Sequence, residues 1–318
     1  MSNQSNNRGR AYEFICMQSL FEEIGKIRPV EVVQNKPYEA AKREWGRLPE
    51  GFQFLLRQSA MAAVETIFDM EPMMLEEGAD VLSLKLQSDS EGRVGDVRDI
   101  VITRSDVKWE IGLSIKHNHK AAKHSRLASR LDFGKEWYDI PCSEKYWGEV
   151  KPIFEYLEES KRIGKAWRDV PNKANSIYVP LLQAFLNEVM YRYSQEKSIA
   201  YKMVEYILGE FDFYKVISVD KKCLTKIQTF NFHGTLNRKS RCVFPKIQIP
   251  PRVYLPTRII SFDFKPNSKT TLELYMDRGW QFSFRIHSAE TYVMPSLKFD
   301  IQIIGMPTTV ISIDCNWK

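Results

Sequence analysis

The chain has 318 residues, 43% of them hydrophobic, with a formal net charge of +6 and a pI near 8.9. This length can bury a full core in one large domain or two closely packed ones. No run approaches the roughly 18 apolar residues of a membrane span, and the polar start MSNQSNNRGR lacks the apolar core of a signal peptide. The five cysteines are scattered, which predicts neither a disulfide framework nor a zinc site and favours the reducing cytoplasm.

Hydrophobic periodicity predicts helices in the first quarter of the chain, after a disordered tip over residues 1–9. The helices are expected over 10–26, 37–46 and 50–70, and Pro72 ends the last one. Strands follow at 80–87, 100–102 (IVI) and 108–116 (KWEIGLSIK). Further helices are expected over 121–131, 151–167 and 176–208. From Phe211 onward the sequence changes to short alternating strands. We therefore predict an α/β fold, with a mixed sheet flanked by helices and a β-rich C-terminal part.

An acid and a lysine are expected to meet where the IVI and KWEIGLSIK strands form a hairpin. Asp99 precedes the first strand and Lys116 ends the second. Because side chains alternate with period two, Glu110, Gly112, Ser114 and Lys116 share a face. A turn at RSDV sets Asp99 opposite Gly112, give or take two residues. This arrangement suits a metal-dependent phosphodiesterase. Glu110 lies roughly 20 Å along the strand from Lys116, so both can flank one metal only if the strand bends.

Several longer motifs extend this pattern, namely GDVRDIVI, IGLSIKHNHKAAKHSRL, DFGKEW with PCSEKYW, and GWQFSFRIHSAET with PSLKFDI. The pattern resembles the PD-(D/E)xK nuclease superfamily, in which an aspartate and a D/E-x-K strand bind a divalent metal. Ser114 stands where the second acid would normally lie, and some members with this serine supply the carboxylate from a helix. The sequence resembles still more closely the HaeIII-type family of type II restriction endonucleases. The resemblance covers most of the chain and is thinnest in the first 50 residues and in 150–210.

The resemblance implies an enzyme that hydrolyses double-stranded DNA at a short palindromic site, GGCC, with Mg²⁺ as its cofactor. It also implies a cognate DNA methyltransferase as a functional partner, since the enzyme would otherwise cut its own genome. A palindromic target leaves a homodimer or successive nicking open. Two other interpretations remain: a non-catalytic DNA-binding regulator, which the serine at position 114 allows, and a repair nuclease with the same core.

The expected catalytic groups are Asp99 and Lys116. Asp99 would hold Mg²⁺ through a hard oxygen ligand. Lys116 would orient or deprotonate the attacking water, or offset charge on the phosphoryl oxygens, and the sequence does not separate these roles.

The third metal ligand is open between several acids. Asp96 is equally well explained as a turn former. Glu65, on the helix expected over 50–70, is a candidate because a helix glutamate often completes the site in the superfamily. Glu110 shares the face of the catalytic lysine but lies far along it. Ser114 could hold a water molecule, although it cannot replace the charge of a carboxylate.

DNA contacts are expected from two basic patches and from polar residues near the C-terminal strands. Lysine and arginine neutralise backbone phosphates, and arginine also reads guanine through a two-pronged hydrogen bond. For any single residue a solvated surface position is the competing interpretation. The candidates are Lys120, Lys123, Arg126, Arg130, Asn231, Asn237, Arg238, Arg241, Arg278, Arg285, His287 and Lys298.

The chain is accordingly divided into four predicted segments. They are an N-terminal helical segment of the nuclease core (1–75), the catalytic core (76–150), a helical region (151–210) and a β-rich DNA-recognition region (211–318).

Overall fold

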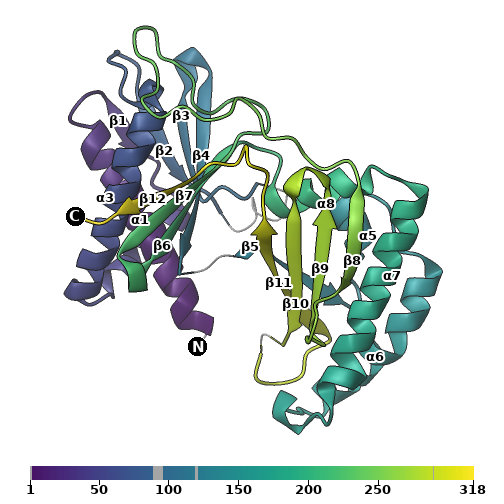
Figure 1. Ribbon diagram of the computed structural model, residues 1–318. Coiled ribbons are helices and arrows are strands. Elements are labelled where there is room, and N and C mark those ends of the chain that lie inside the picture. The colour runs from purple at the N-terminus through teal and green to yellow at the C-terminus, as the bar shows by residue number, and fades with distance from the viewer. Residues whose placement is uncertain (1, 89–95, 119–120, 289) are drawn as a thin grey trace. The chain divides into compact units, whose positions relative to one another are not determined.

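The structure is a computed structural model that describes residues 2–88, 96–118, 121–288 and 290–318. The chain forms two compact units, each built from segments that are far apart in the sequence (Figure 1). The first unit contains Met1–Lys120, Glu210–Tyr254 and Thr308–Lys318. The second unit contains Ala121–Gly209 and Leu255–Pro307. Each unit has a sheet of its own.

The sheet of the first unit is mixed. Its strands are β1 (Val30–Val32), β2 (Leu82–Leu86), β3 (Ile100–Arg104), β4 (Trp109–His117), β6 (Phe213–Val219), β7 (Leu224–Phe230) and β12 (Ser312–Asn316). They lie in the order β1-β2-β3-β4-β6-β7-β12. The β1/β2 and β4/β6 pairs are parallel, and the other pairs are antiparallel. The strand β6 is therefore the neighbour of β4, although the second unit contributes residues 121–209 between them.

Three helices pack against this sheet: α1 (Ser2–Ile24), α2 (Lys36–Gly46) and α3 (Glu50–Met70). Asn35 caps α2, because its side chain accepts a hydrogen bond from the Tyr38 N–H at 3.0 Å. Alternation along β4 turns Ile111, Leu113 and Ile115 into the apolar core that includes buried residues of α1 and α3.

The second unit combines an antiparallel sheet with helices that cover one of its faces (Figure 1). The strands are β5 (Ala121–Ala128), β8 (Ile259–Phe264), β9 (Thr271–Met276), β10 (Gln281–His287) and β11 (Ser296–Gly305), in the order β5-β11-β10-β9-β8. The helices are α5 (Phe133–Tyr138), α6 (Glu144–Arg162), α7 (Val179–Gln195) and α8 (Ile199–Leu208). Aromatic rings fill the core between the layers, with ring centres 4.8 Å apart for Phe133 and Phe185 and 5.0 Å apart for Phe185 and Phe299.

Short turns connect the longer elements. The 3₁₀ turns are η1 (Pro72–Met74), η2 (Ser105–Val107), η3 (Trp167–Asp169), η5 (Asp220–Lys222) and η6 (Asp277–Gly279), and η4 (Ala174–Tyr178) is a turn of π-helix. In the part of the chain that the structure describes, no helix combines the length and apolar character needed to cross a membrane.

The predicted fold class is confirmed, since helices flank a mixed sheet and the C-terminal part is rich in strands. Two local predictions are wrong. The expected disordered tip is helical from Ser2 onward. The expected basic helix over 121–131 is the strand β5, which pairs with β11 more than 160 residues later. The predicted segments 76–150 and 211–318 each contribute to both compact units, and the functions assigned to the four segments stay predictions.

Candidate active site

The carboxylate of Asp99 and the ammonium group of Lys116 meet where β3 begins and β4 ends. Lys116 Nζ lies 3.0 Å from Asp99 Oδ2. Ile100 pairs with Leu113 across the two strands, which puts Asp99 opposite Ser114. The Asp99 N–H donates to the Leu113 carbonyl at 2.8 Å and fixes this register one residue beyond the strand. The predicted meeting of the two side chains is confirmed.

The Asp99 carboxylate is held in one orientation by β4. The Ile115 N–H donates to Oδ2 at 2.6 Å, and the Ser114 hydroxyl lies 3.4 Å from the same oxygen. Among the described residues, every hydrogen bond to this carboxylate reaches Oδ2 and none reaches Oδ1. The side chain is 24% exposed. Asp99 can therefore offer Oδ1 to a cation while the backbone of β4 holds the other oxygen.

Lys116 is a cation in this arrangement. Burial lowers the pKa of Lys116, but the charge and hydrogen bond of Asp99 and the charge of Glu13 outweigh it, so the pKa lies above its usual value. A protonated amine cannot accept a proton from water. The geometry therefore favours charge compensation over general base catalysis for Lys116.

Helix α1 brings a second carboxylate, that of Glu13, into the electrostatic environment of Lys116. One turn later, burial raises the pKa of the Cys16 thiol, and the charges of both Glu13 and Asp99 raise it further. Glu13 and Asp99 therefore act on the same groups. The sequence analysis missed Glu13. The sequence feature that could have indicated it is an acid within the apolar run of Tyr12, Phe14 and Ile15, and in the structure this acid is half-buried.

A second lysine, Lys215 on β6, also faces this site. Lys215 is the register partner of Ser114 and is 3% exposed. Burial lowers the pKa of Lys215 to about 7, and the charge of Lys116 lowers it while that of Asp99 raises it. The sequence analysis missed this residue as well, although a lysine inside the apolar strand YKVISV is a visible anomaly.

The other predicted acids form ion pairs elsewhere. Glu65 is exposed on α3, and its carboxylate bonds to Lys318 Nζ at 2.5 Å. Arg98 binds both Asp96, at 2.7 and 2.8 Å, and Glu110, at 2.7 Å. The recorded bonds of these acids do not reach Asp99 or Lys116. The structure therefore gives no support to Asp96, Glu65 or Glu110 as the third ligand.

The side chain of Arg98 starts beside Asp99 and runs along β4 over Gly112 to Glu110. Its aliphatic stem occupies the space that a Cβ atom on Gly112 would need. Its guanidinium stacks on Phe211, with the carbon 4.1 Å from the ring centre. Gly112 is thus required by close packing, in a strand whose other end carries Lys116.

The oxygen donors at the site fit Mg²⁺. This cation is commonly held by one or two carboxylates, with waters and substrate phosphates completing the shell. Asp99 is such a carboxylate, the Ser114 hydroxyl lies 3.4 Å from its Oδ2, and the charge of Glu13 acts on the neighbouring Lys116. Outside the few residues that the structure leaves undescribed, no three histidine, cysteine or acidic side chains cluster as a metal-binding group. The site therefore suits a cation that shares its coordination with substrate.

Two predicted DNA contacts in the first unit instead stabilise a loop. Asn231 is 1% exposed, and its side chain accepts from the Leu236 N–H at 3.2 Å. Asn237 donates through Nδ2 to the carbonyls of Met70 at 2.8 Å and Ile247 at 2.9 Å. The backbone of the loop occupies these amides, which gives both residues a structural role, and their DNA contact stays a prediction. Arg238 and Arg241 are exposed and stay candidates, and Arg238 lines a cavity of about 330 Å³.

The predicted basic patch after β4 divides between the faces of the second unit's sheet. Lys123 points to the helices, because Nζ donates to the Tyr206 carbonyl at 2.8 Å and lies 3.7 Å from the centre of its ring. Burial lowers the pKa of Lys123 to about 8. This lysine therefore has a packing role, and its contact with DNA stays a prediction. Arg126 is exposed, and Lys120 lies outside the described residues.

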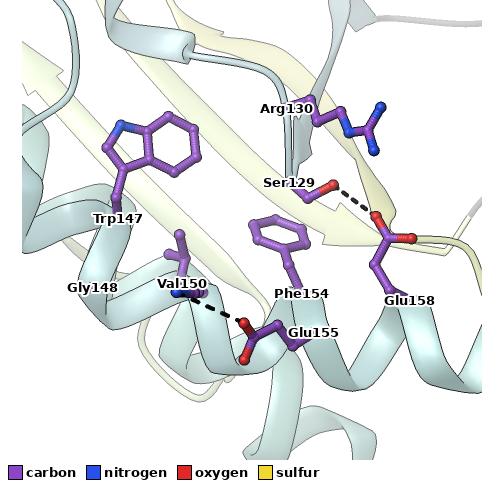
Figure 2. A pocket seen from close by; sticks show the side chains of 9 residues that line it. Ser129, Arg130, Trp147, Gly148, Val150, Phe154, Glu155 and Glu158 are labelled. Carbon is purple, nitrogen blue, oxygen red and sulfur yellow. Dashed lines mark hydrogen bonds and ion pairs between the residues drawn. The ribbon is translucent and has the colours of Figure 1, made fainter.

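The remaining candidates in the second unit are accessible. Arg130 lines a cavity of about 440 Å³ whose walls include Trp147, Val150 and Phe154 (Figure 2). Figure 2 also shows the hydrogen bond from the Ser129 hydroxyl to Glu158, at 3.1 Å. The Arg278 side chain is exposed and donates to the Leu255 carbonyl at 2.6 Å. Arg285, His287 and Lys298 lie on β10 and β11.

Comparison with known proteins identifies the family of the chain. A family model described as HaeIII restriction endonuclease matches residues 9–307. The chain is 48% identical, over the full length of both proteins, to the type II restriction enzyme HaeIII of Haemophilus aegyptius. No solved structure matches the chain. The chain belongs to the HaeIII restriction endonuclease family.

Proposed function

We propose that the protein is a type II restriction endonuclease that hydrolyses double-stranded DNA at GGCC with the help of Mg²⁺. The observation that carries this proposal is the contact of 3.0 Å between Lys116 Nζ and Asp99 Oδ2 in a chain of this family. GGCC is the site of the HaeIII relative, which shares 48% of its residues with this chain.

In this proposal Asp99 and Glu13 would hold the cation. When bound, Mg²⁺ would supply a Lewis acid for the scissile phosphate and lower the pKa of a bound water. The Ile115 N–H fixes Asp99 Oδ2 and leaves Oδ1 available to a cation. Lys116 would donate a hydrogen bond to a non-bridging phosphoryl oxygen and offset the negative charge that develops there. Lys215 adds a buried amine to the same face.

The regulator alternative depends on the serine at position 114. A carboxylate at that position is not needed if α1 supplies one, and Glu13 is an acid of α1 whose charge acts on Lys116. The position of Glu13 therefore favours a catalytic protein over a degenerate one. A repair nuclease with the same core remains the second alternative, and the pattern of cleavage separates it from a restriction enzyme.

The proposed activity brings further requirements. A chromosome with unprotected GGCC sites would be cut, so a cognate methyltransferase is the expected functional partner. A palindromic site is read either by a two-fold symmetric homodimer or in two successive nicks. We place the enzyme in the cytoplasm because its duplex substrate is there.

The test is digestion of a plasmid with Mg²⁺, beside a control with EDTA. Discrete fragments that end at GGCC are expected, whereas a smear would indicate a repair nuclease and intact DNA a regulator. Asp99→Ala and Lys116→Ala should abolish cleavage and leave duplex binding in Ca²⁺ nearly unchanged. Asp106→Ala, at an exposed position in the turn of the same hairpin, is the matched control. Normal cleavage by Asp99→Ala would show that the site is wrong.

A further inference from the structure

Cationic side chains gather on one face of the second unit's sheet. Along β10 and β11, Ile286, Leu297 and Phe299 are buried on the face that packs against helices. The alternate residues project from the other face. In the described part of the chain, Arg126 of β5, Lys298 of β11, and Arg285 and His287 of β10 lie on that face, and we call these residues the basic row.

The register places like charges side by side. Lys298 is the direct partner of Arg126 on one side and of His287 on the other. Arg285 lies two residues before His287 on the same strand. Like charges directly opposite each other destabilise a sheet, so the folding of this unit alone does not explain the arrangement.

One acid lies among the cations of the basic row. Asp300 of β11 is the register partner of Arg285, and its charge partly offsets the lowering of the pKa of both Lys298 and His287. Arg126 donates to the Ser296 hydroxyl at 3.2 Å. Arg126, Arg285 and Lys298 together outweigh this one carboxylate, so the row keeps an excess of positive charge. Burial lowers the pKa of Lys298, and the charge of Arg126 lowers it further. Burial also lowers the pKa of His287, followed by the charge of Lys298. The residues of the row therefore repel one another.

The basic region is confined to three of the strands. On the same face, the register partner of Ser283 is Glu273 of β9, and the partner of Glu273 is Asp263 of β8. Glu273 is paired with Lys265 at 3.2 Å. The excess of positive charge on this face therefore lies over β5, β11 and β10, where a ligand with several negative charges is expected to bind.

We propose that the basic row contacts the phosphate backbone of duplex DNA and contributes affinity that does not depend on sequence. This inference rests on the proposed function, which supplies duplex DNA as the ligand. Closely spaced cations can neutralise neighbouring phosphates and release their counterions. Base recognition by arginine requires a guanidinium held in one orientation toward a base edge. Arg285 is exposed, and among the described residues no hydrogen bond is seen that would fix its orientation. The row therefore positions the duplex, and other side chains read it.

The experiment measures binding by fluorescence anisotropy in Ca²⁺ at several salt concentrations. One duplex contains GGCC and a second duplex of the same length lacks it. The variants are Arg126→Gln, Lys298→Gln and Arg285→Gln. Lys145→Gln and Lys151→Gln are the matched controls, because both lysines are exposed on α6 of the same unit and lose the same charge. Thermal unfolding confirms that each variant is folded, and relief of repulsion should leave its midpoint unchanged or higher.

Each row variant is expected to weaken binding to both duplexes by the same factor, about 3- to 10-fold. It should also reduce the slope of log affinity against log salt by about 0.9, the value for one lost phosphate contact. The controls should change neither quantity. An unchanged slope would overturn the proposal, and so would a loss confined to the GGCC duplex, because that result assigns the row to base reading.

Cleavage by the wild-type protein is measured separately. If the row variants lose affinity but the wild type never cuts DNA, the proposed function fails and the inference stands. If the wild type cuts at GGCC and the row variants bind like the controls, the inference fails and the proposed function stands.

Discussion

Glu71 offers a quantitative test of the electrostatics around the catalytic sheet. It follows the last residue of α3 and is fully buried. Its Oε1 accepts hydrogen bonds from the Tyr214 hydroxyl at 2.5 Å and from the Asn237 N–H at 2.6 Å. Its Oε2 is buried without a partner in the described part of the chain. Burial raises the pKa of Glu71 from 4.5 to about 7, although both hydrogen bonds and the charge of Arg238 lower it.

The shift has a defined effect on stability. Because the folded state binds this proton more tightly than the unfolded state, the contribution of Glu71 is complete below pH 4.5. It is lost as the pH rises through about 7. A shift from 4.5 to about 7 corresponds to about 3 kcal/mol. Glu71→Gln keeps an acceptor for Tyr214 and Asn237 without a charge. We therefore expect Glu71→Gln to match the wild type near pH 4.5 and to be about 3 kcal/mol more stable at pH 8.5.

The assay is urea denaturation of both proteins at pH 5 and pH 8.5. The difference between their free energies of unfolding at each pH isolates Glu71 from all other titrating groups. Glu77→Gln, at an exposed position on the same connection, is the control and should leave the pH profile unchanged. Parallel profiles for the wild type and Glu71→Gln would refute the reasoning.

Three further substitutions test the site. Glu13→Gln should lower the initial rate of cleavage about 10- to 100-fold in assays at several Mg²⁺ concentrations, and the control Glu65→Gln should not lower it. If Glu13→Gln and Glu65→Gln cleave at equal rates, Glu13 does not belong to the site. Gly112→Ala should destabilise the protein by about 1–3 kcal/mol, because the side-chain stem of Arg98 that lies over this glycine must move. The control is Gly51→Ala, whose added Cβ atom meets no atom within 4 Å. If calorimetry shows Gly112→Ala to be at least as stable as Gly51→Ala, this packing is contradicted. Because burial lowers the pKa of Lys215 to about 7, the wild type should gain stability relative to Lys215→Met as the pH rises from 7 to 10, and urea midpoints that change in parallel over this range would contradict the shift.

Local pattern was sufficient to predict the hairpin. The strands β3 and β4 are adjacent in the sequence, so alternation and a short turn fix which residues meet, and Asp99 meets Lys116 as expected. The helix over 50–70 was predictable for the same reason, because its apolar spacing and Pro72 are local. The parts that local pattern determines agree with the structure.

Non-local packing accounts for what the sequence did not predict. Residues 121–128 are a strand because they pair with β11, a partner whose position no local signal gives. The choice between Glu13 and Glu65 depends on which helix approaches the end of β4, which is a tertiary property. Asn231 and Asn237 are residue types that often contact DNA, but in the structure their side-chain amides donate hydrogen bonds to backbone carbonyls.

The interleaving of the two units has a consequence for biosynthesis. The strand β6, with Lys215, lies beside β4, but the ribosome makes it only after the whole of residues 121–209. Pairing across such a distance closes slowly, because the long intervening segment must be brought together first. A nascent chain interrupted anywhere in that segment would present Asp99 and Lys116 on an incomplete sheet, without the neighbour that buries Ser114. Truncated translation products should therefore lack a complete active site. This prevents incomplete chains of a DNA-cleaving enzyme from damaging the chromosome.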